Sequence, residues 1–179
     1  MSLLKRIYTI GHSTRSLEEF TALLAEHDIV RLADIRRYPG SRRYPHFSGE
    51  SLQQTLPEQG IAYEHFDSLG GRRKALSQSE NGAWKNEQFR GYADHMATGE
   101  FRAAIDRLLA DQRPTAVMCA EAVPWRCHRN LLSDDLVRRG IEVIHIVGAG
   151  ASQPHELSQM ARLKPDRVTY PPEQSTIFD

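Results

Sequence analysis

The sequence lacks most of the features that would assign a protein class directly. It contains only two cysteines, Cys119 and Cys127, in 179 residues, too few for the disulfide framework of a small secreted domain. No apolar run is long enough to span a bilayer, and the first residues do not form the apolar stretch and small-residue cleavage site of a signal peptide. We therefore expect a cytoplasmic protein with reduced thiols and no membrane partner.

Two further absences narrow the choice of ligand. Neither Gly-x-Gly-x-x-Gly nor a Walker sequence follows the first expected strand, so no nucleotide cofactor is implied and the cofactor is left unknown. The formal net charge is zero, so the total charge does not indicate a polyanionic partner. Between Arg31 and Arg43, however, there are five arginines and one acid. This local excess suits a small anion or a phosphate backbone; the alternative is a solvated loop with scattered surface ion pairs.

Apolar runs of strand length alternate along the chain with segments of helical periodicity. Such alternation predicts an α/β fold in which helices cover both faces of a mainly parallel, five-stranded sheet. We expect one three-layer α/β/α domain, Rossmann-like, over residues 1–147, and a C-terminal extension, 148–179, packed on the same domain. The extension should hold a short helix near 156–163 and an edge strand at 168–170. The five expected strands are residues 6–10, 29–35, 61–66, 115–118 and 141–147.

The expected order of these strands in the sheet is 3-2-1-4-5. In that order the direction of the chain reverses between the first and fourth strands, and the loops after these two strands meet at the switch point where open α/β sheets bind ligands. His12 and Ser13 should then lie beside the segment 119–129. Asp34 and Arg36 should lie one strand further out.

The segment from Pro114 to Arg139 carries the densest chemistry of the chain. Its apolar strand ends at Cys119, an irregular loop containing Pro124 follows, and a helix closed by Gly140 comes next. A helix that begins just after a strand presents its backbone N–H groups and the positive end of its dipole to a ligand. The reactive or ionic side chains placed there are Cys119, Glu121, Arg126, Cys127, His128 and Arg129.

Four motifs, in the same order along the chain, resemble those of one known family. They are Thr9-Ile10-Gly11-His12-Ser13; Asp34-Ile35-Arg36 with Pro39 and Ser41-Arg42; Leu69-Gly70-Gly71; and Cys119-Ala120-Glu121 with Cys127-His128-Arg129. From about residue 6 to residue 147 the chain resembles a member of the domain-of-unknown-function family 488. The resemblance implies a single α/β domain and supplies no activity. Ile35 stands where the family pattern has valine, and the residues after 147 lie outside the pattern.

Cys119 is the first candidate for catalysis, as a nucleophile or redox thiol. At the end of a strand that faces a helix N-terminus and several arginines, the pKa of a thiol falls below about 8.5 because only the thiolate is stabilised there. The arrangement is similar to the cysteine loops of rhodaneses and cysteine phosphatases, although Arg126 follows Cys119 by seven residues where the phosphatase loop has six. The alternative is a small hydrophobic residue buried at a strand end.

Glu121 and His12 are the candidate proton carriers, since both sit in loops at the expected site and imidazole titrates near neutral pH. A structural histidine that bonds a loop carbonyl is the alternative for His12. Asp34 is expected to support the site through bidentate pairing with Arg36 or Arg129.

Arginines are the candidate anion ligands, because guanidinium groups near a helix N-terminus suit phosphate, sulfate or carboxylate. Aromatic residues interleave with them and would stack a nucleic-acid base, although aromatic residues beside proline also pin loops in place. The expected anion-binding residues are Ser13, Arg36, Ser41, Arg42, Arg126 and Arg129, and the aromatic ones are Tyr38, Tyr44, Phe47 and Trp125.

A transition metal is the remaining alternative. His12, Glu121, Cys127 and His128 offer nitrogen, oxygen and sulfur ligands. Their spacing is not that of a familiar zinc site, and adjacent residues on a helix diverge by about 100°. No metal is therefore favoured, and Cys127 and His128 are expected as supporting residues.

The sequence thus leaves three hypotheses of different classes. The leading one is an enzyme of unassigned reaction that acts on a small anionic or phosphate-bearing substrate. The second is a non-catalytic module that binds nucleic acid or nucleotides, and the third is a metal-dependent hydrolase. The sequence does not indicate an oligomeric state.

Overall fold

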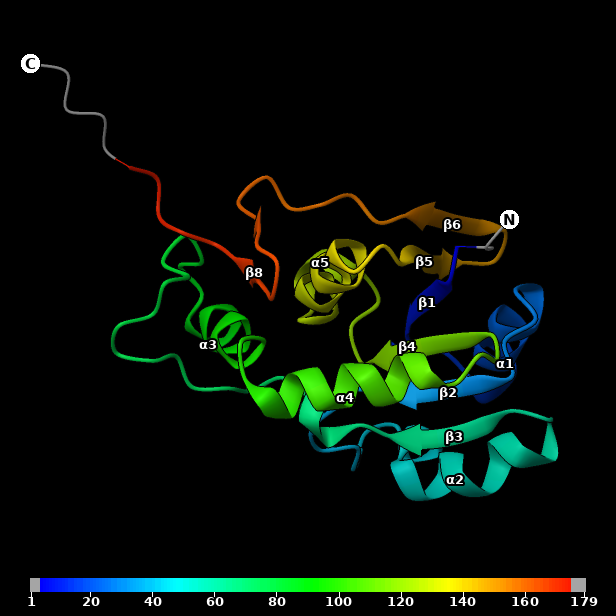
Figure 1. The fold of residues 1–179 in the computed structure, drawn as a ribbon. Coiled ribbons are helices and arrows are strands. Elements are labelled where there is room, and N and C mark those ends of the chain that lie inside the picture. The colour runs from blue at the N-terminus through cyan, green and yellow to red at the C-terminus, as the bar shows by residue number, and fades with distance from the viewer. Residues whose placement is uncertain (1–3, 175–179) are drawn as a thin grey trace, which may run out of the picture.

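A mostly parallel sheet runs through the centre of the protein (Figure 1). The computed structural model describes residues 4–174. Within this range the main sheet has six strands in the order β3-β2-β4-β1-β5-β6, all parallel except β6, which is antiparallel to β5. The strands of this sheet are β1 (Arg6–Gly11), β2 (Arg31–Asp34), β3 (Ala62–His65), β4 (Thr115–Cys119), β5 (Glu142–Gly148) and β6 (Ala151–Pro154).

The α/β class and the mainly parallel sheet are confirmed, whereas two details of the expected sheet are wrong. β4 lies between β2 and β1 instead of outside β1, and β6 adds a sixth strand. β1 and β4 are neighbours, as expected. Because both are apolar interior strands, their hydrophobic patterns do not distinguish which one pairs with β2. The exchange makes β2 a direct neighbour of β4 instead of β1, and Asp34 and Arg36 still follow a strand that lies one position outside the β1–β4 pair, as expected.

Helices cover both faces of the sheet and form the outer layers. One face packs against α1 and α2 through a core that includes Phe20, Leu24 and Leu52; the other packs against α3, α4 and α5 through Tyr92, Phe101 and Leu131. Figure 1 shows α4 running in front of the sheet. The helices are α1 (Leu17–Glu26), α2 (Gly49–Glu58), α3 (Glu87–His95), α4 (Gly99–Ala110) and α5 (Arg129–Arg138).

The two-residue period of β4 sets the direction in which the first cysteine points. All five residues of the strand are buried. Ala116 and Met118 face the α1–α2 layer, whereas Val117 and Cys119 face the α3–α5 layer, because successive side chains of a strand point to opposite faces. Cys127, in the loop before α5, belongs to the same apolar cluster as Cys119. The fold therefore directs both thiols into one layer.

The C-terminal extension packs on the core through elements other than the expected ones. After β6, residues 156–163 form no helix, and β8 (Val168–Thr169) pairs with β7 (Arg162–Leu163) in a separate two-stranded sheet instead of joining the main one. Val168 and Tyr170 are nonetheless buried in the main core. The edge position expected for 168–170 is wrong because these apolar side chains cover α3 and α5, not the sheet edge.

A buried chain of hydrogen bonds ties this extension to the sheet. Asp134 accepts from Tyr170 Oη at 2.7 Å and from His155 Nε2 at 2.7 Å. His155 Nδ1 lies 2.8 Å from His145 Nε2, and His145 Nδ1 lies 2.6 Å from the hydroxyl oxygen of Thr9. The network joins β1, β5, α5 and the extension.

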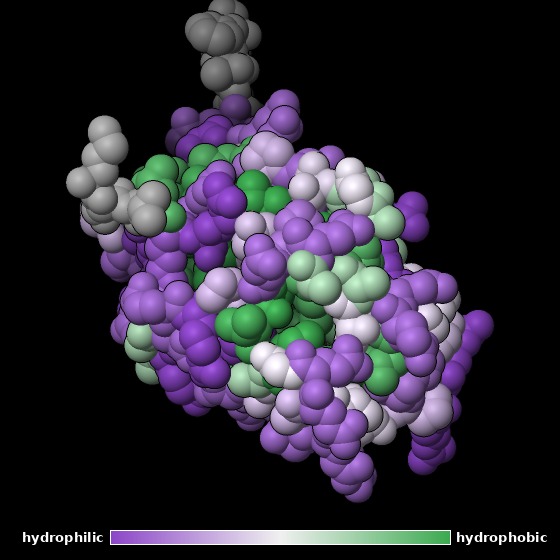
Figure 2. Space-filling view, turned by 90° about the vertical axis from the view of Figure 1, so that its right-hand side faces the viewer, coloured by the Kyte–Doolittle hydropathy of each residue, from purple (hydrophilic) through white to green (hydrophobic). Residues whose placement is uncertain are grey.

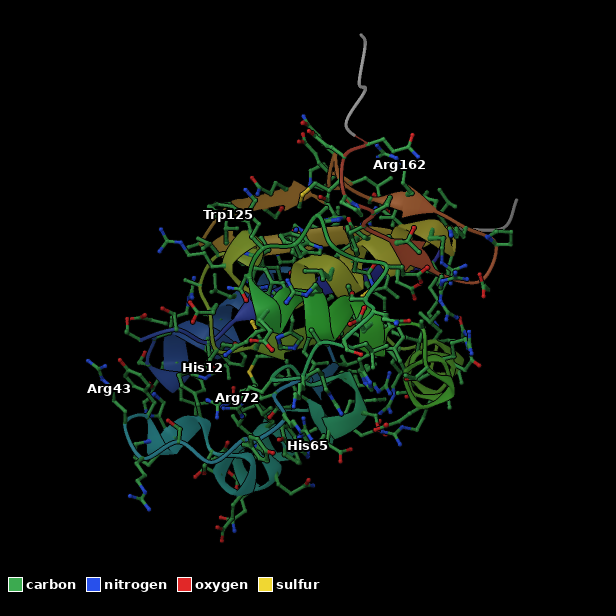
Figure 3. The ribbon with its side chains drawn as sticks, turned by 90° about the vertical axis from the view of Figure 1, so that its left-hand side faces the viewer. His12, Arg43, His65, Arg72, Trp125 and Arg162 are labelled. Carbon is green, nitrogen blue, oxygen red and sulfur yellow. The ribbon has the colours of Figure 1, made fainter. Side chains whose placement is uncertain are left out.

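Figures 2 and 3 view the molecule from the two ends of the sheet. The end seen in Figure 2 is mixed, with apolar residues grouped near its centre among hydrophilic ones. Figure 3 faces the opposite end, toward which the arrows of β2, β3 and β4 point in Figure 1. None of the helices within residues 4–174 has the length and apolarity needed to cross a lipid bilayer.

Candidate functional site

The loops that follow β1, β2 and β4 meet at the carboxyl end of the sheet. His12 N–H donates to the carbonyl oxygen of Cys119 at 3.0 Å, and Ile35 N–H donates to that of Met118 at 3.0 Å. The end of β4 is thus held from both sides by its neighbouring strands. Figure 3 shows His12, Arg72 and Trp125 at this end, contributed by segments far apart in the sequence.

A pocket of about 310 Å³ opens here. The two cysteines line it although they are only 2% and 5% exposed, so they lie at its bottom. Four arginines and one glutamate surround them, which makes the lining strongly cationic. The lining residues are Arg36, Arg37, Tyr38, Gly71, Arg72, Gln88, Phe89, Cys119, Ala120, Glu121, Arg126, Cys127 and His128.

The thiol of Cys127 donates a hydrogen bond to the sulfur of Cys119, and the two Sγ atoms are 2.7 Å apart. Both cysteines are free. Burial alone would raise the pKa of Cys119, but the hydrogen bond from Cys127 and the charge of Arg129 outweigh it and leave this pKa below its ordinary value. Burial and the same hydrogen bond raise the pKa of Cys127 well above its ordinary value. Of the two thiols, Cys119 is therefore the one that ionises more readily.

Arg129, the first residue of α5, is the cation whose charge lowers the pKa of Cys119. It is fully buried, and its Nη2 donates to the carbonyl oxygen of Ala122 at 3.1 Å. Within residues 4–174 its Nε and Nη1 have no hydrogen-bond partner. A buried guanidinium is costly unless a negative charge balances it, so Arg129 favours the ionised form of the Cys119 thiol.

His128 lies beside the second thiol as a neutral imidazole. Its Nε2 donates to the carbonyl oxygen of Ile35 at 3.1 Å, and a carbonyl only accepts, so the proton of the ring is on Nε2. Its Nδ1 lies 3.6 Å from the Cys127 sulfur and is free to accept. Burial lowers the pKa of His128 to about 4, which keeps the ring neutral near pH 7.

Asp34 and Arg36 form a bidentate pair on the wall of the pocket. Asp34 is fully buried and accepts from Arg36 Nε at 2.9 Å and from Arg36 Nη2 at 2.6 Å. The hydroxyl of Tyr63 donates to the same carboxylate at 2.6 Å. Of the two partners expected for Asp34, the structure thus supplies Arg36 and not Arg129. The carboxylate fixes the guanidinium at the wall and balances most of its charge.

The chain matches the model of a known protein family. The model of the family "Domain of unknown function DUF488" matches residues 16–136, about two thirds of the chain. The chain belongs to the DUF488 family. The matched range contains both cysteines, Asp34 and Arg36, but leaves out the Thr9–Ser13 motif. No curated protein and no solved structure matches the chain.

Among the expected site residues of the DUF488 chain that do not line the pocket are His12, Ser41 and Arg42. His12 is 4% exposed, donates from Nδ1 to the carbonyl oxygen of Ser13 at 2.9 Å and stacks on Phe47. Its Nε2 faces Arg36 Nη1 at 3.4 Å, and burial lowers its pKa. Ser41 accepts from the N–H of Tyr44 at 2.9 Å, and the remaining one, Arg42, is exposed.

Ser13 lies outside the pocket lining, whereas Glu121 belongs to it. The N–H of Ser13 extends the pairing of β1 and β4 by donating to the carbonyl oxygen of Ala120 at 2.9 Å. Glu121 lines the mouth of the pocket and is exposed. Arg126 lines it as well and is exposed. The structure therefore brings together Cys119, Glu121, Arg126, Cys127 and His128 around the pocket, with Arg129 buried behind them.

Two arginines that line the pocket were not predicted from the sequence as site residues. Arg37 and Arg72 both lie against the ring of Tyr38, at 5.6 and 5.8 Å from its centroid, and Arg37 Nη1 donates to the carbonyl oxygen of Arg72 at 3.0 Å. Arg72 comes from the loop after β3. The glycine pair before Arg72 is the sequence feature that indicates this position. A Cβ at Gly70 would lie 2.6 Å from the Cα of Arg37, so a glycine is needed for the two loops to approach each other.

The metal ligands considered from the sequence are not brought together. Among residues 4–174, no group of three or more His, Cys, Asp or Glu side chains is arranged to hold a metal ion. His12 stays outside the pocket, and both ring nitrogens of His128 have protein partners.

Proposed function

We propose that this DUF488 chain is an enzyme that uses the thiolate of Cys119 as a nucleophile on a small anionic or phosphate-bearing substrate. One observation carries the proposal: the Cys119 sulfur accepts the S–H of Cys127 beside Arg129, a buried guanidinium of which two nitrogens have no partner among residues 4–174. A cysteine that served only as packing would need neither neighbour. Thiolate character at the bottom of a pocket is the condition for nucleophilic cysteine catalysis.

The residues around the thiol divide the remaining tasks. Arg126, Arg72 and Arg37 line the pocket and would bind the anionic part of the substrate. Arg36 is already paired with Asp34. Its guanidinium would therefore offer the substrate a hydrogen-bond donor in a fixed position, and its charge is largely balanced. Glu121 at the mouth is the acidic side chain of the lining and would carry a proton to or from the reacting group.

The test uses two alkylating reagents of similar size, neutral iodoacetamide and anionic iodoacetate. We expect both reagents to alkylate Cys119 faster than free cysteine at neutral pH. The ratio of the iodoacetate rate to the iodoacetamide rate should also be higher for Cys119 than for free cysteine. Peptide mass analysis of the wild type, Cys119→Ser and Cys127→Ser identifies the modified residue. Inorganic phosphate should slow the reaction by competing for the arginines.

A matched pair of variants tests the anion site. Arg126→Gln removes a charge from the pocket lining, whereas Arg42→Gln removes an exposed charge outside it. Arg126→Gln should abolish most of the preference for iodoacetate, and Arg42→Gln should leave it unchanged. Slow alkylation of Cys119 in the folded protein would contradict the nucleophile, and equal effects of the two variants would contradict the anion site.

Nucleotide or nucleic-acid binding is the second candidate, favoured by two exposed aromatic residues. Tyr38, which lines the pocket, is 63% exposed, and Trp125, in the turn before α5, is 58% exposed. Either ring would stack a base. Binding of a single-stranded oligonucleotide that weakens steeply with salt and is lost in Trp125→Ala would support this candidate. Binding that does not depend on Trp125 or on salt would contradict it.

A further inference from the structure

The geometry points to a dithiol cycle: Cys119 attacks a small anionic disulfide, and Cys127 then displaces the bound half to form a Cys119–Cys127 disulfide. The inference rests on the proposed nucleophilic role of Cys119 and deepens it by naming the substrate class and a second catalytic residue. In this cycle the protein is a thiol–disulfide oxidoreductase.

The two sulfurs are already placed for the second step. Their separation is 2.7 Å, and a disulfide bond is about 2.05 Å long, so closure requires a movement of well under 1 Å. Both cysteines line the same pocket. Cys119 ends β4, and Cys127 follows a single turn of 3-10 helix, Pro124–Arg126, in the loop before α5. Rotation of one side chain or a small shift of this loop is sufficient, and no element of the core has to move.

The charges assign an order to the two thiols. Because Cys127 donates its hydrogen bond to Cys119, Cys119 is the sulfur that holds a negative charge more readily, and it attacks first. Once Cys119 is part of a mixed disulfide it can no longer hold that charge. Arg129 remains buried behind both residues, with no partner for Nε and Nη1 among residues 4–174, and then favours the thiolate of Cys127. His128 Nδ1, 3.6 Å from the Cys127 sulfur, is an acceptor close to the proton.

The steps balance without a further oxidant. The Cys119 thiolate attacks one sulfur of the substrate R–S–S–R, forms the bond Cys119–S–S–R and releases R–S⁻. Cys127 attacks the Cys119 sulfur, the bond to R breaks, and the proton of Cys127 leaves with the second half as R–SH. The substrate gains two electrons and is reduced, and the protein dithiol is oxidised to the disulfide. A low-molecular-weight dithiol returns the protein to its starting state.

The pocket favours a disulfide with anionic groups as the electrophile. Arg37, Arg72 and Arg126 surround the thiols within a volume of about 310 Å³, which accommodates one organic half of such a molecule and its carboxylates. Hydrogen peroxide, which is small and neutral, would use neither the volume nor the charge. The peroxide is therefore a discriminating second reagent.

The experiment treats the fully reduced protein with oxidised glutathione and follows the intact mass. We expect the wild type to lose two hydrogens and to release two glutathione molecules per chain. Cys127→Ser should stop at a stable glutathione adduct on Cys119, and Cys119→Ser should react at least about tenfold more slowly because the attacking thiolate is gone. Cys127→Ala, checked by circular dichroism, repeats the trap in case serine perturbs folding.

The arginine variants test the substrate class. Arg126→Gln should slow the reaction with oxidised glutathione and leave that with hydrogen peroxide unchanged, and Arg42→Gln should alter neither. Oxidation by peroxide that is faster and equally sensitive to Arg126→Gln would overturn the anionic disulfide as substrate. Fast alkylation of Cys119 combined with a lasting glutathione adduct in the wild type would overturn the dithiol cycle alone. Slow alkylation together with no adduct would overturn the proposed function as well.

Discussion

The carbonyl group of Glu121 lies directly over the Cα of Gly11. A Cβ added to Gly11 would come within 1.7 Å of the Glu121 oxygen, a distance that no pair of non-bonded atoms adopts. The loop that follows Cys119 therefore crosses the end of β1 at backbone contact. Glycine at this position is a steric requirement of the site, and its role does not depend on an unusual backbone conformation.

Gly11→Ala should accordingly destabilise the protein and disorganise the thiol pair together. Overpacking of this kind costs about 3 kcal/mol or more when the obstacle is backbone. Urea denaturation measures the loss, and the alkylation rate of Cys119 in the remaining folded protein measures the displacement of the loop. Gly40→Ala is the matched control, since nothing lies within 4 Å of a Cβ there. A wild-type stability for Gly11→Ala would contradict the crossing.

Arg129→Met should preserve the fold while raising the pKa of Cys119. Methionine fills much of the same volume, and removal of a buried charge that lacks two of its partners costs little stability. Loss of one nearby buried cation should raise the thiol pKa by at least about 1 unit and slow alkylation at neutral pH about tenfold. The ultraviolet absorbance of the thiolate, followed against pH, measures the shift. Arg138→Met, at the other end of α5, should leave this titration unchanged.

Asp34→Asn and Tyr63→Phe should lower the free energy of unfolding by different amounts, although both change the interactions of the Asp34 carboxylate. Asp34→Asn leaves Arg36 as a buried charge without its counterion, which should cost about 3 kcal/mol or more. Tyr63→Phe removes one hydrogen bond of 2.6 Å from a carboxylate that keeps its Arg36 partner, which should cost about 1 kcal/mol. Chemical denaturation of both variants gives the comparison. Equal losses would mean that the ion pair adds nothing beyond packing.

Stability should fall as the pH is lowered from about 7 to 5. Burial lowers the pKa of His145 to about 3 and that of His128 to about 4, whereas in the unfolded chain both titrate near 6.5. Below that value the unfolded state binds more protons than the folded one, so their contribution to stability is complete above about pH 6.5 and is lost progressively down to about pH 3. Over the range from pH 7 to 5 we expect a decrease of roughly 4 kcal/mol for the two histidines together.

Urea denaturation at several pH values measures this decrease. His145→Gln keeps a polar side chain but removes one titrating ring, so its stability should be lower at pH 7 and its slope against pH about half as steep. Carboxylates titrate mainly below this range and do not obscure the effect. A free energy of unfolding that stays constant between pH 7 and 5 would contradict the assigned neutral states of the two histidines.

The layers of the fold could be predicted from the sequence because each strand is a short apolar run followed by a helix with one apolar face. The order of β1 and β4 could not, since both strands are buried on two faces and carry no mark of their neighbours. The meeting of the loops after β1 and β4 survived this error, because the two strands are adjacent in either order.

The site was predictable where its residues are close in sequence and not elsewhere. Cys119, Cys127 and Arg129 stand within one segment, so their convergence follows from a strand, a short loop and a helix start. Arg72 enters from the loop after β3, and only the tight approach permitted by Gly70 places it there. Asp134 and Tyr170 are also far apart along the chain. No sequence pattern predicts the hydrogen bond between them.

The burial of Arg129 has a practical consequence beyond chemistry. In an unfolded chain this side chain would be solvated and distant from both sulfurs, which would then behave as two ordinary thiols. The difference in reactivity proposed between Cys119 and a free cysteine would thus exist only in correctly assembled molecules. The fraction of Cys119 modified in a brief pulse of alkylating reagent would therefore measure the native fraction of this protein.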